Sequence, residues 1–289
     1  MPGLILKTAT ALCLVAAPAF AECPADAAGS VRILSNDFSA LNAIVGRAMT
    51  CATPDLQISA NQTTEHANLQ VPALTVNPAE YTAAFGANGS LTVLMSAGLL
   101  RPLDDLVAQY GQDLLPTQLV RIDGKVMAIA FMANAEHFFY REDVLAEAGV
   151  EPPQTWDEVL AAAAQIREQG IMENPIGMAY APGWELGQGF VNMYLGLGGE
   201  LFQPGSALPG IANAQGVTAL ETMKALSQFM DPDYLTWSAD SIVPLFEADQ
   251  IAMTNLWGSS AANLLPGTQV APTSAPFMRL AAAPMMPGG

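Results

Sequence analysis

Basic residues are scarce in this sequence. Its 289 residues include 10 Lys and Arg but 27 Asp and Glu, which gives a formal net charge of −17 at pH 7. A field of that sign repels phosphate backbones and anionic lipid surfaces. The composition therefore argues against nucleic acids and membrane surfaces as partners, while a hydrophobic share of 51% is enough for a substantial core.

Long apolar runs are missing outside the N-terminus. Residues 1–21 combine Lys7 with an apolar run over 9–17 and a small-residue motif that ends at Ala21. This arrangement is typical of a secretory signal peptide, whereas a membrane anchor needs roughly 20 apolar residues. We therefore expect cleavage after Ala21 and a mature chain that is exported to the periplasm.

Cysteine and histidine are also rare. Cys13 lies in the predicted signal peptide, which leaves Cys23 and Cys51 in an oxidising compartment. Two cysteines there indicate one disulfide, with two free thiols as the alternative. Zinc needs about four ligands, and His66 and His137 lie far apart in sequence, so we expect neither a metal nor a cofactor.

Strand-like and helix-like segments alternate along the first part of the chain. The pattern predicts strands at 31–35, 56–59 and 81–85, a broken helix at 68–76, and helices at 38–50, about 90–97 and 103–110. Such alternation indicates a mostly parallel sheet with helices on both faces. Ligands of these sheets bind beyond the carboxyl ends of the strands.

A second group of local signals lies in the middle of the chain. The segment 122–140 begins with an Asp-Gly turn and reads as an apolar strand, followed by a helix that stops at Gly149. Thr155 and Glu158 have the spacing of a capping box at the start of the next helix. Trp156 follows the cap, and we expect it to pack between these two helices.

Three segments resemble a known family. The segments "LRPLDDLVAQYG", "DGKVMAIAFMANAEHFFYREDVLAEAGVEPPQTWDEVLAAAAQI" and "FEADQIAMTNLWG" occur in this order. They are similar to the ABC-transporter extracellular solute-binding proteins of family 1, the sugar-binding type. The resemblance implies a two-lobed α/β fold of the periplasmic-binding-protein type II kind, with mostly parallel sheets. It also implies a monomer without catalytic activity, which traps a sugar or polyol between its lobes and delivers it to the transmembrane subunits of an ABC permease.

The same resemblance implies a division of the chain. After the signal peptide at 1–21, the first α/β lobe covers 22–131 and the second covers 132–278, with a crossing strand at 131–140. Residues 279–289 resemble the start of a segment that returns to the first lobe. Because the chain ends there, we expect the first lobe to be incomplete.

Candidate ligand-binding residues come from strand ends and from tryptophans. In the first lobe, polar residues follow each predicted strand, and on the crossing segment two polar residues stand out; capping and turn roles are the alternatives. Tryptophan suits the apolar faces of a sugar, with core packing as its alternative. The candidates are Asn36, Asp37, Glu65, His66, Asn88, Asn134, His137, Trp184 and Trp257.

The sequence is also compatible with two other functions. A polyamine binder of the same fold fits an acidic cleft, because such a cleft suits a cation. An exported glycoside hydrolase needs two facing carboxylates, which 27 acidic residues can supply. A serine esterase is disfavoured, since the sequence contains no Gly-x-Ser-x-Gly motif.

Overall fold

The computed structural model describes residues 23, 26–267 and 273–286. The predicted signal peptide at 1–21 lies outside the described residues. The chain forms two compact units, unit 1 (Met1–Arg101) and unit 2 (Pro102–Gly289). The lobe boundaries expected at 131/132 and 278/279 stay predictions.

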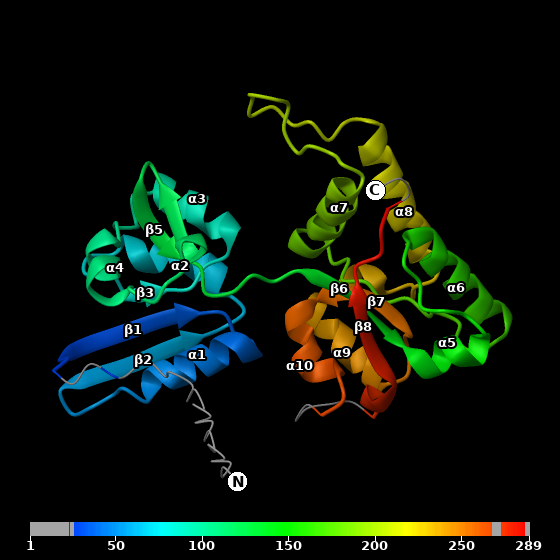
Figure 1. Ribbon diagram of the computed structural model, residues 1–289, viewed down its shortest axis with the longest axis horizontal. Helices are drawn as coiled ribbons and strands as arrows, with labels where there is room; N and C mark the ends of the chain where they lie inside the picture. The colour runs from blue at the N-terminus through cyan, green and yellow to red at the C-terminus, as the bar shows by residue number, and fades with distance from the viewer. Residues whose placement is uncertain (1–22, 24–25, 268–272, 287–289) are drawn as a thin grey trace, which may run out of the picture. The chain divides into compact units, whose positions relative to one another are not determined.

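Unit 1 is built on a small parallel sheet (Figure 1). Its strand order is β2-β1-β3, and both neighbours run parallel to β1. The helix α1 contacts β2, whereas α2 contacts β1 and α3. The elements are β1 (Gly29–Ser35), α1 (Ser39–Met49), β2 (Leu56–Gln62), α2 (His66–Thr75), β3 (Ala83–Ala84) and α3 (Asn88–Ser96).

The third strand is shorter than the sequence indicates. Only Ala83 and Ala84 pair with β1, although backbone hydrogen bonds from Thr82 and Phe85 to β1 flank them. The core of this unit includes Ile33 and Leu34 from β1 and Leu41 and Val45 from α1, as helical spacing predicts.

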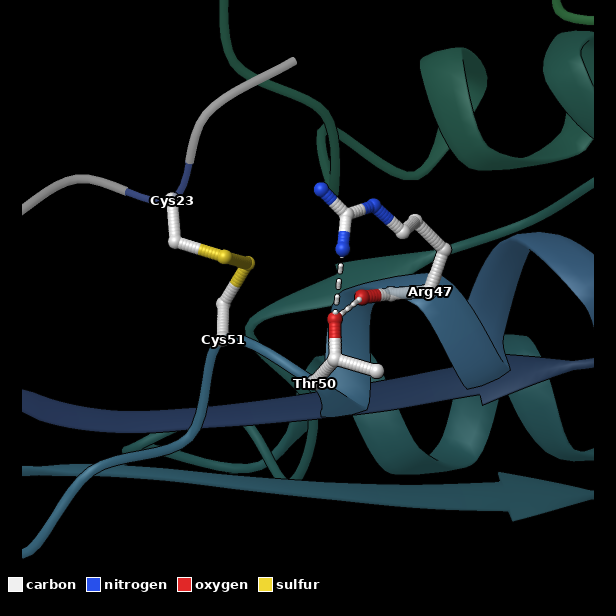
Figure 2. Close-up of a disulfide and its surroundings, with 4 residues drawn as sticks. All are labelled: Cys23, Arg47, Thr50 and Cys51. Carbon is white, nitrogen blue, oxygen red and sulfur yellow. Dashed lines mark hydrogen bonds between the residues drawn. A yellow bond between two sulfur atoms is a disulfide. The ribbon is translucent and has the colours of Figure 1, made fainter. Parts of the chain in front are cut away.

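A disulfide joins Cys23 to Cys51, with the two Cα atoms 5.3 Å apart (Figure 2). Cys51 follows the last turn of α1, where the Arg47 guanidinium donates to Thr50 Oγ1 at 2.9 Å. The bridge therefore ties the segment before β1 to the end of α1.

Unit 2 begins with a helix and a β-hairpin. The helix α4 (Asp104–Tyr110) is followed by β4 (Leu119–Ile122) and β5 (Lys125–Ile129), which pair antiparallel. Asp123 and Gly124 form the turn with positive φ angles of 50° and 79°, as the Asp-Gly dipeptide predicts. The Asp104 carboxylate accepts a hydrogen bond from the Val126 backbone and fixes α4 to the hairpin.

Unit 2 contains a second three-stranded sheet. Its order is β7-β6-β8, formed by β6 (Glu136–Arg141), β7 (Met253–Trp257) and β8 (Met278–Ala282). Both neighbours run antiparallel to β6: β7 begins beside Tyr140 and β8 begins beside Arg141, at the end of β6. The parallel arrangement predicted from the sequence therefore describes the sheet of unit 1, while β6 pairs with β7 and β8 in the opposite sense.

Side chains along β6 alternate between the two faces of the sheet, which divides the core of unit 2 into two layers. Phe138 and Tyr140 lie in one buried cluster, and Phe139 lies in the other. The first cluster contains side chains of α5 (Glu142–Ala148), α6 (Trp156–Glu168), α7 (Trp184–Gly196) and α8 (Ala214–Ser227). The second contains side chains of α9 (Ala239–Glu247) and α10 (Ala261–Leu264). Helices thus cover both faces of the sheet (Figure 1).

The corner between α5 and α6 has the structure that the sequence predicts. Gly149 ends α5 in the left-handed conformation, with φ of 70°. Thr155 accepts from the Glu158 backbone at 3.2 Å, and the Glu158 carboxylate accepts from the Thr155 backbone at 3.1 Å. Trp156 is 4% exposed and packs in the cluster that contains both helices, so its predicted packing role is confirmed.

Ion pairs of Arg141 fix the end of β6. Its guanidinium donates to Asp143 at 2.7 and 2.6 Å and to Asp249, in the turn before β7, at 2.5 Å. Hydrogen bonds from Arg141 also hold the pKa of Asp143 below its usual range. The pair of carboxylates fixes β6 relative to the turn that leads into β7.

Candidate functional site

A small hollow opens in unit 2 where β6 begins and β7 ends. Side chains from both strands, from the loop at 178–180 and from the first half of α7 form its wall. The lining residues are Glu136, Met178, Ala179, Tyr180, Glu185, Gly189, Asn255, Leu256 and Trp257.

Strand register brings three of these side chains to one face of the sheet. Glu136 pairs with Trp257, and Phe138 pairs with Asn255. Because side chains alternate along a strand, Glu136, Asn255 and Trp257 lie on the same face as Phe138. The core on that face includes residues of α7, whose Gly189 also lines the hollow.

Gly189 allows α7 to approach this wall. A Cβ atom at this position would lie 3.2 Å from Cε1 of Tyr180 and 3.5 Å from Cε of Met223. A side chain here would require the Tyr180 ring or the helix to shift by a few tenths of an ångström. The glycine therefore keeps Tyr180 and α7 in close contact beside the hollow.

The carboxylate of Glu136 is held by two side-chain amides. Asn255 Nδ2 donates to Glu136 Oε2 at 2.6 Å. Asn192 of α7 also hydrogen-bonds to Glu136, while its own Oδ1 accepts from Gln188 at 3.0 Å. Burial raises the pKa of Glu136 above its usual range, and nearby Glu185 raises it further, whereas the two amides oppose the shift.

Glu185 supplies a second carboxylate to the same hollow. Its Oε1 accepts from the backbone N–H of Ala239, the first residue of α9, at 3.2 Å. A carboxylate at a helix N-terminus is favoured by the helix dipole. Burial nevertheless raises the pKa of Glu185, and Asp240 adds to the shift.

Two buried polar atoms of the wall lack a hydrogen-bond partner within the described part of the chain. They are the hydroxyl of Tyr180 and Oδ1 of Asn255, on side chains whose residues are 2% and 6% exposed. Leaving such atoms unpaired costs about 1–3 kcal/mol each. Both atoms belong to residues that line the hollow, and unpaired buried polar atoms of this kind call for an explanation such as a ligand or a water.

The candidates of unit 1 follow the ends of its parallel strands, as predicted. Asp37 follows β1, and its carboxylate accepts from Asn42 Nδ2 at 2.9 Å rather than capping α1. Asn36 Oδ1 accepts from the Asp37 backbone at 2.9 Å. Asn88 is the first residue of α3. Their roles as ligand contacts stay predictions.

Glu65 and His66 stand at the start of α2, after β2. Glu65 Oε2 accepts from Asn68 Nδ2 at 2.8 Å, within the same helix turn. Burial lowers the pKa of His66, and hydrogen bonds with the Thr64 and Thr63 backbone oppose the shift. Their ligand roles also stay predictions.

The candidates on the crossing segment already have protein partners. Asn134 exchanges two hydrogen bonds with Ser259, at 3.1 and 3.2 Å. His137 lies on the face of β6 opposite Glu136, and its Nδ1 is 3.0 Å from the Ala135 carbonyl oxygen. The structure thus separates His137 from the face that carries Trp257, and both ligand assignments stay predictions.

The two tryptophan candidates differ in their surroundings. Trp257 is half-buried and lines the hollow. Trp184 begins α7, is 64% exposed and does not belong to the lining. Of the predicted ligand residues, only Trp257 lines the hollow.

The other polar residues of the hollow were not predicted from the sequence. Glu136 and Asn255 carried a usable signal, because each interrupts a segment of apolar strand residues. No feature of the sequence distinguishes Tyr180 and Glu185 from ordinary loop and helix residues. In the parts of the chain that the structure describes, no group of three His, Cys, Asp or Glu side chains is placed to hold a metal ion.

A sequence model of the bacterial extracellular solute-binding proteins matches residues 54–289. The chain belongs to this family. The predicted family resemblance is thereby confirmed. No helix in the described ranges of this solute-binding protein has both the length and the apolar character to cross a membrane.

Similar proteins extend the comparison. An uncharacterized ABC transporter extracellular-binding protein of Pyrococcus horikoshii is 25% identical over 142 residues, which is 49% of this chain but only 30% of that protein. A solute-binding protein of Agrobacterium radiobacter, solved with ribitol, has a TM-score of 0.75 at 17% identity, over 90% of this chain and 67% of that one.

A sugar transporter protein of Arthrobacter chlorophenolicus, solved with laminaribiose, also has a TM-score of 0.75, at 15% identity, over 90% of this chain and 67% of that one. Similarity at this level of identity shows the fold. It confirms the predicted α/β solute-binding-protein fold for this chain.

Proposed function

We propose that this solute-binding protein captures a carbohydrate in the periplasm and delivers it unchanged to the transmembrane subunits of an ABC permease. The observation that carries the proposal is the position of Trp257 beside Glu136 and Asn255 in one hollow of unit 2. The family of extracellular solute-binding proteins supports an exported binding protein.

The chemistry of the hollow suits a sugar or a polyol. A pyranose ring presents flat C–H surfaces that pack on an aromatic face, and its hydroxyls need acceptors and donors at fixed positions. Trp257 supplies the aromatic surface. Glu136 supplies a carboxylate, and Asn255 and Tyr180 supply polar atoms that have no partner in the described part of the chain.

The ligands of similar proteins support the same class of solute. Ribitol and laminaribiose are bound by two solved proteins of this fold. We propose a protein without catalytic activity, because one of the two carboxylates in the hollow, Glu185, is engaged by the start of α9. A glycosidase needs both carboxylates free to flank the scissile bond. The family resemblance also leads us to propose a monomer.

A polyamine is the second candidate. Two carboxylates, Glu136 and Glu185, line one hollow, and the chain as a whole carries a net charge of −17. Both features attract a cation.

A titration series separates these possibilities. Refolded, ligand-stripped protein is screened by thermal shift against sugars, polyols and polyamines, and each hit is titrated by calorimetry. We expect a carbohydrate to raise Tm and to be recovered chemically unchanged. Stabilisation by polyamines alone, or release of hydrolysed product, contradicts the proposed function.

A further inference from the structure

We infer that the hollow of unit 2 recognises a protonated amino group, so that the solute is an amino sugar or an amino polyol. The inference rests on the proposed function and narrows its ligand class. It comes from the carboxyl groups and the unpaired acceptor atoms of the wall. A neutral carbohydrate satisfies these groups less well than a protonated amine does.

The wall carries two carboxyl groups without a balancing cation. Glu136 and Glu185 both line the hollow, and none of the described lining residues is Lys, Arg or His. The ion pairs in the described part of the chain involve other carboxylates, such as Asp104, Asp143 and Asp249. A partly buried carboxylate favours a neighbouring positive charge strongly, because solvent screens it poorly.

The wall also offers hydrogen-bond acceptors in excess. Asn255 donates its amide to Glu136, which leaves Oδ1 of a side chain only 6% exposed without a partner in the described part of the chain. The Tyr180 hydroxyl is a second such atom and can also accept. A carboxylate adds further acceptor positions.

An ammonium group matches this set of atoms. It has three N–H donors and no acceptor, whereas a hydroxyl has one donor. Its donors match in kind the Glu136 carboxylate and the unpaired oxygens of Asn255 and Tyr180 in the lining. Hydrogen bonds between charged partners are roughly twice as strong as those between neutral ones.

Trp257 argues for a ring or a polyol chain beside the amine. An aromatic face packs against C–H surfaces and also attracts a cation. The lining holds one pair of carboxylates, Glu136 and Glu185, which suits one amino group. A polyamine chain needs further anionic positions along its length, and the lining offers none beyond this pair.

The test uses compounds that differ only in an amino group. The full chain is titrated by calorimetry with glucosamine and glucose, galactosamine and galactose, mannosamine and mannose, glucamine and glucitol, and the disaccharides of glucosamine and of glucose. Spermidine is titrated in parallel. We expect at least one amino compound to bind about tenfold tighter, or more, than its neutral partner.

Three variants locate the effect. Glu136→Gln and Glu185→Gln keep the shape of the side chains and remove one charge each. We expect Glu136→Gln to bring the affinities for the amino and neutral partners within about twofold, and Glu185→Gln to reduce the preference in part. Glu147→Gln on the exposed face of α5 removes the same charge outside the lining and should leave the preference intact. Thermal melts of each variant report whether it is folded.

The outcomes separate this inference from the proposed function. Neutral members that bind as tightly as amino members, or a preference that survives in both Glu136→Gln and Glu185→Gln, overturn the inference and leave carbohydrate binding in place. Binding of spermidine alone, or of no compound in the series, overturns both.

Discussion

Asn255 donates its side-chain amide to the Glu136 carboxylate at 2.6 Å, between the antiparallel neighbours β7 and β6. The two residues are 119 positions apart in the sequence. Their contact orients a carboxylate beside Trp257 and leaves Asn255 Oδ1 without a partner in the described part of the chain. This pair forms the centre of the proposed ligand site.

Replacing Asn255 should weaken ligand binding. In Asn255→Ala, Glu136 loses a donor and the ligand loses an acceptor, so we expect calorimetry to show a loss of about 1–3 kcal/mol in binding free energy. Thr254→Val is the matched control, because Thr254 is buried, has an unpaired hydroxyl within the described residues and lies on the opposite face of β7. Equal affinities of the two variants would argue against a ligand role for Asn255.

Replacing Trp257 should affect ligand binding, whereas replacing Trp156 should affect the stability of the fold. Trp257→Ala should lower affinity by more than about 1 kcal/mol, because an aromatic surface is removed from the ligand. Trp156→Ala should lower the free energy of unfolding by about 3–5 kcal/mol while its folded fraction binds normally, since Trp156 lies in the core at the capped corner. Denaturant melts and calorimetry measure the two effects, and the reverse assignment contradicts the account.

The carboxylates of the hollow should make the ligand-free protein less stable at neutral pH. Burial raises the folded-state pKa of Glu136 and of Glu185, so their stabilising contribution is present below the ordinary glutamate value and is lost as pH rises through the raised pKa. The charged or titratable groups facing them are Tyr180 and Asp240, besides each other.

Comparing Glu136→Gln with the unmodified protein isolates this effect from other titrations. The folded-state pKa of His66 is lowered, so its contribution to stability is lost as pH falls from the ordinary histidine pKa through the lowered one. The contribution of Asp143, whose pKa is also lowered, is lost only at lower pH. We expect Glu136→Gln to unfold at higher denaturant concentration at pH 7, with the difference shrinking as the pH is lowered towards the ordinary glutamate value. A variant less stable than the unmodified protein at pH 7 contradicts the expected cost of the buried charge.

The disulfide should stabilise unit 1. Cys23 and Cys51 are 28 residues apart, and closing a loop of this size contributes about 3.6 kcal/mol in the chain-entropy model. Replacing both cysteines by serine should lower the free energy of unfolding by about that amount. Thiol titration of denatured, unreduced protein should find both cysteines blocked, and two free thiols would contradict the bridge.

Local signals in the sequence predicted local structure well. The capping box at Thr155 and the left-handed Gly149 depend on neighbours within a few residues, and both are present. The first two strands and the first helix of unit 1 also follow from their apolar periodicity. Such features need no information about the rest of the chain.

Long-range pairing could not be predicted in the same way. The apolar segment at 122–140 reads as one strand, yet β5 ends at Ile129 and pairs in a hairpin, while β6 starts at Glu136 and joins another sheet. The partner of β6 and its register are set by packing of residues more than a hundred positions away. The contact between Glu136 and Asn255 depends on that register, so the sequence alone pointed to Trp257 and not to its polar neighbours.

The most direct test follows the indole N–H signals of the protein by NMR during titration with carbohydrates. The chain has four tryptophans, and Trp257→Phe identifies the signal of Trp257. We predict that the Trp257 signal shifts and saturates with a sugar, a polyol or an amino derivative of either, while the signal of buried Trp156 stays in place. A Trp257 signal that no carbohydrate moves, at concentrations that saturate binding measured by calorimetry, would contradict the proposed site.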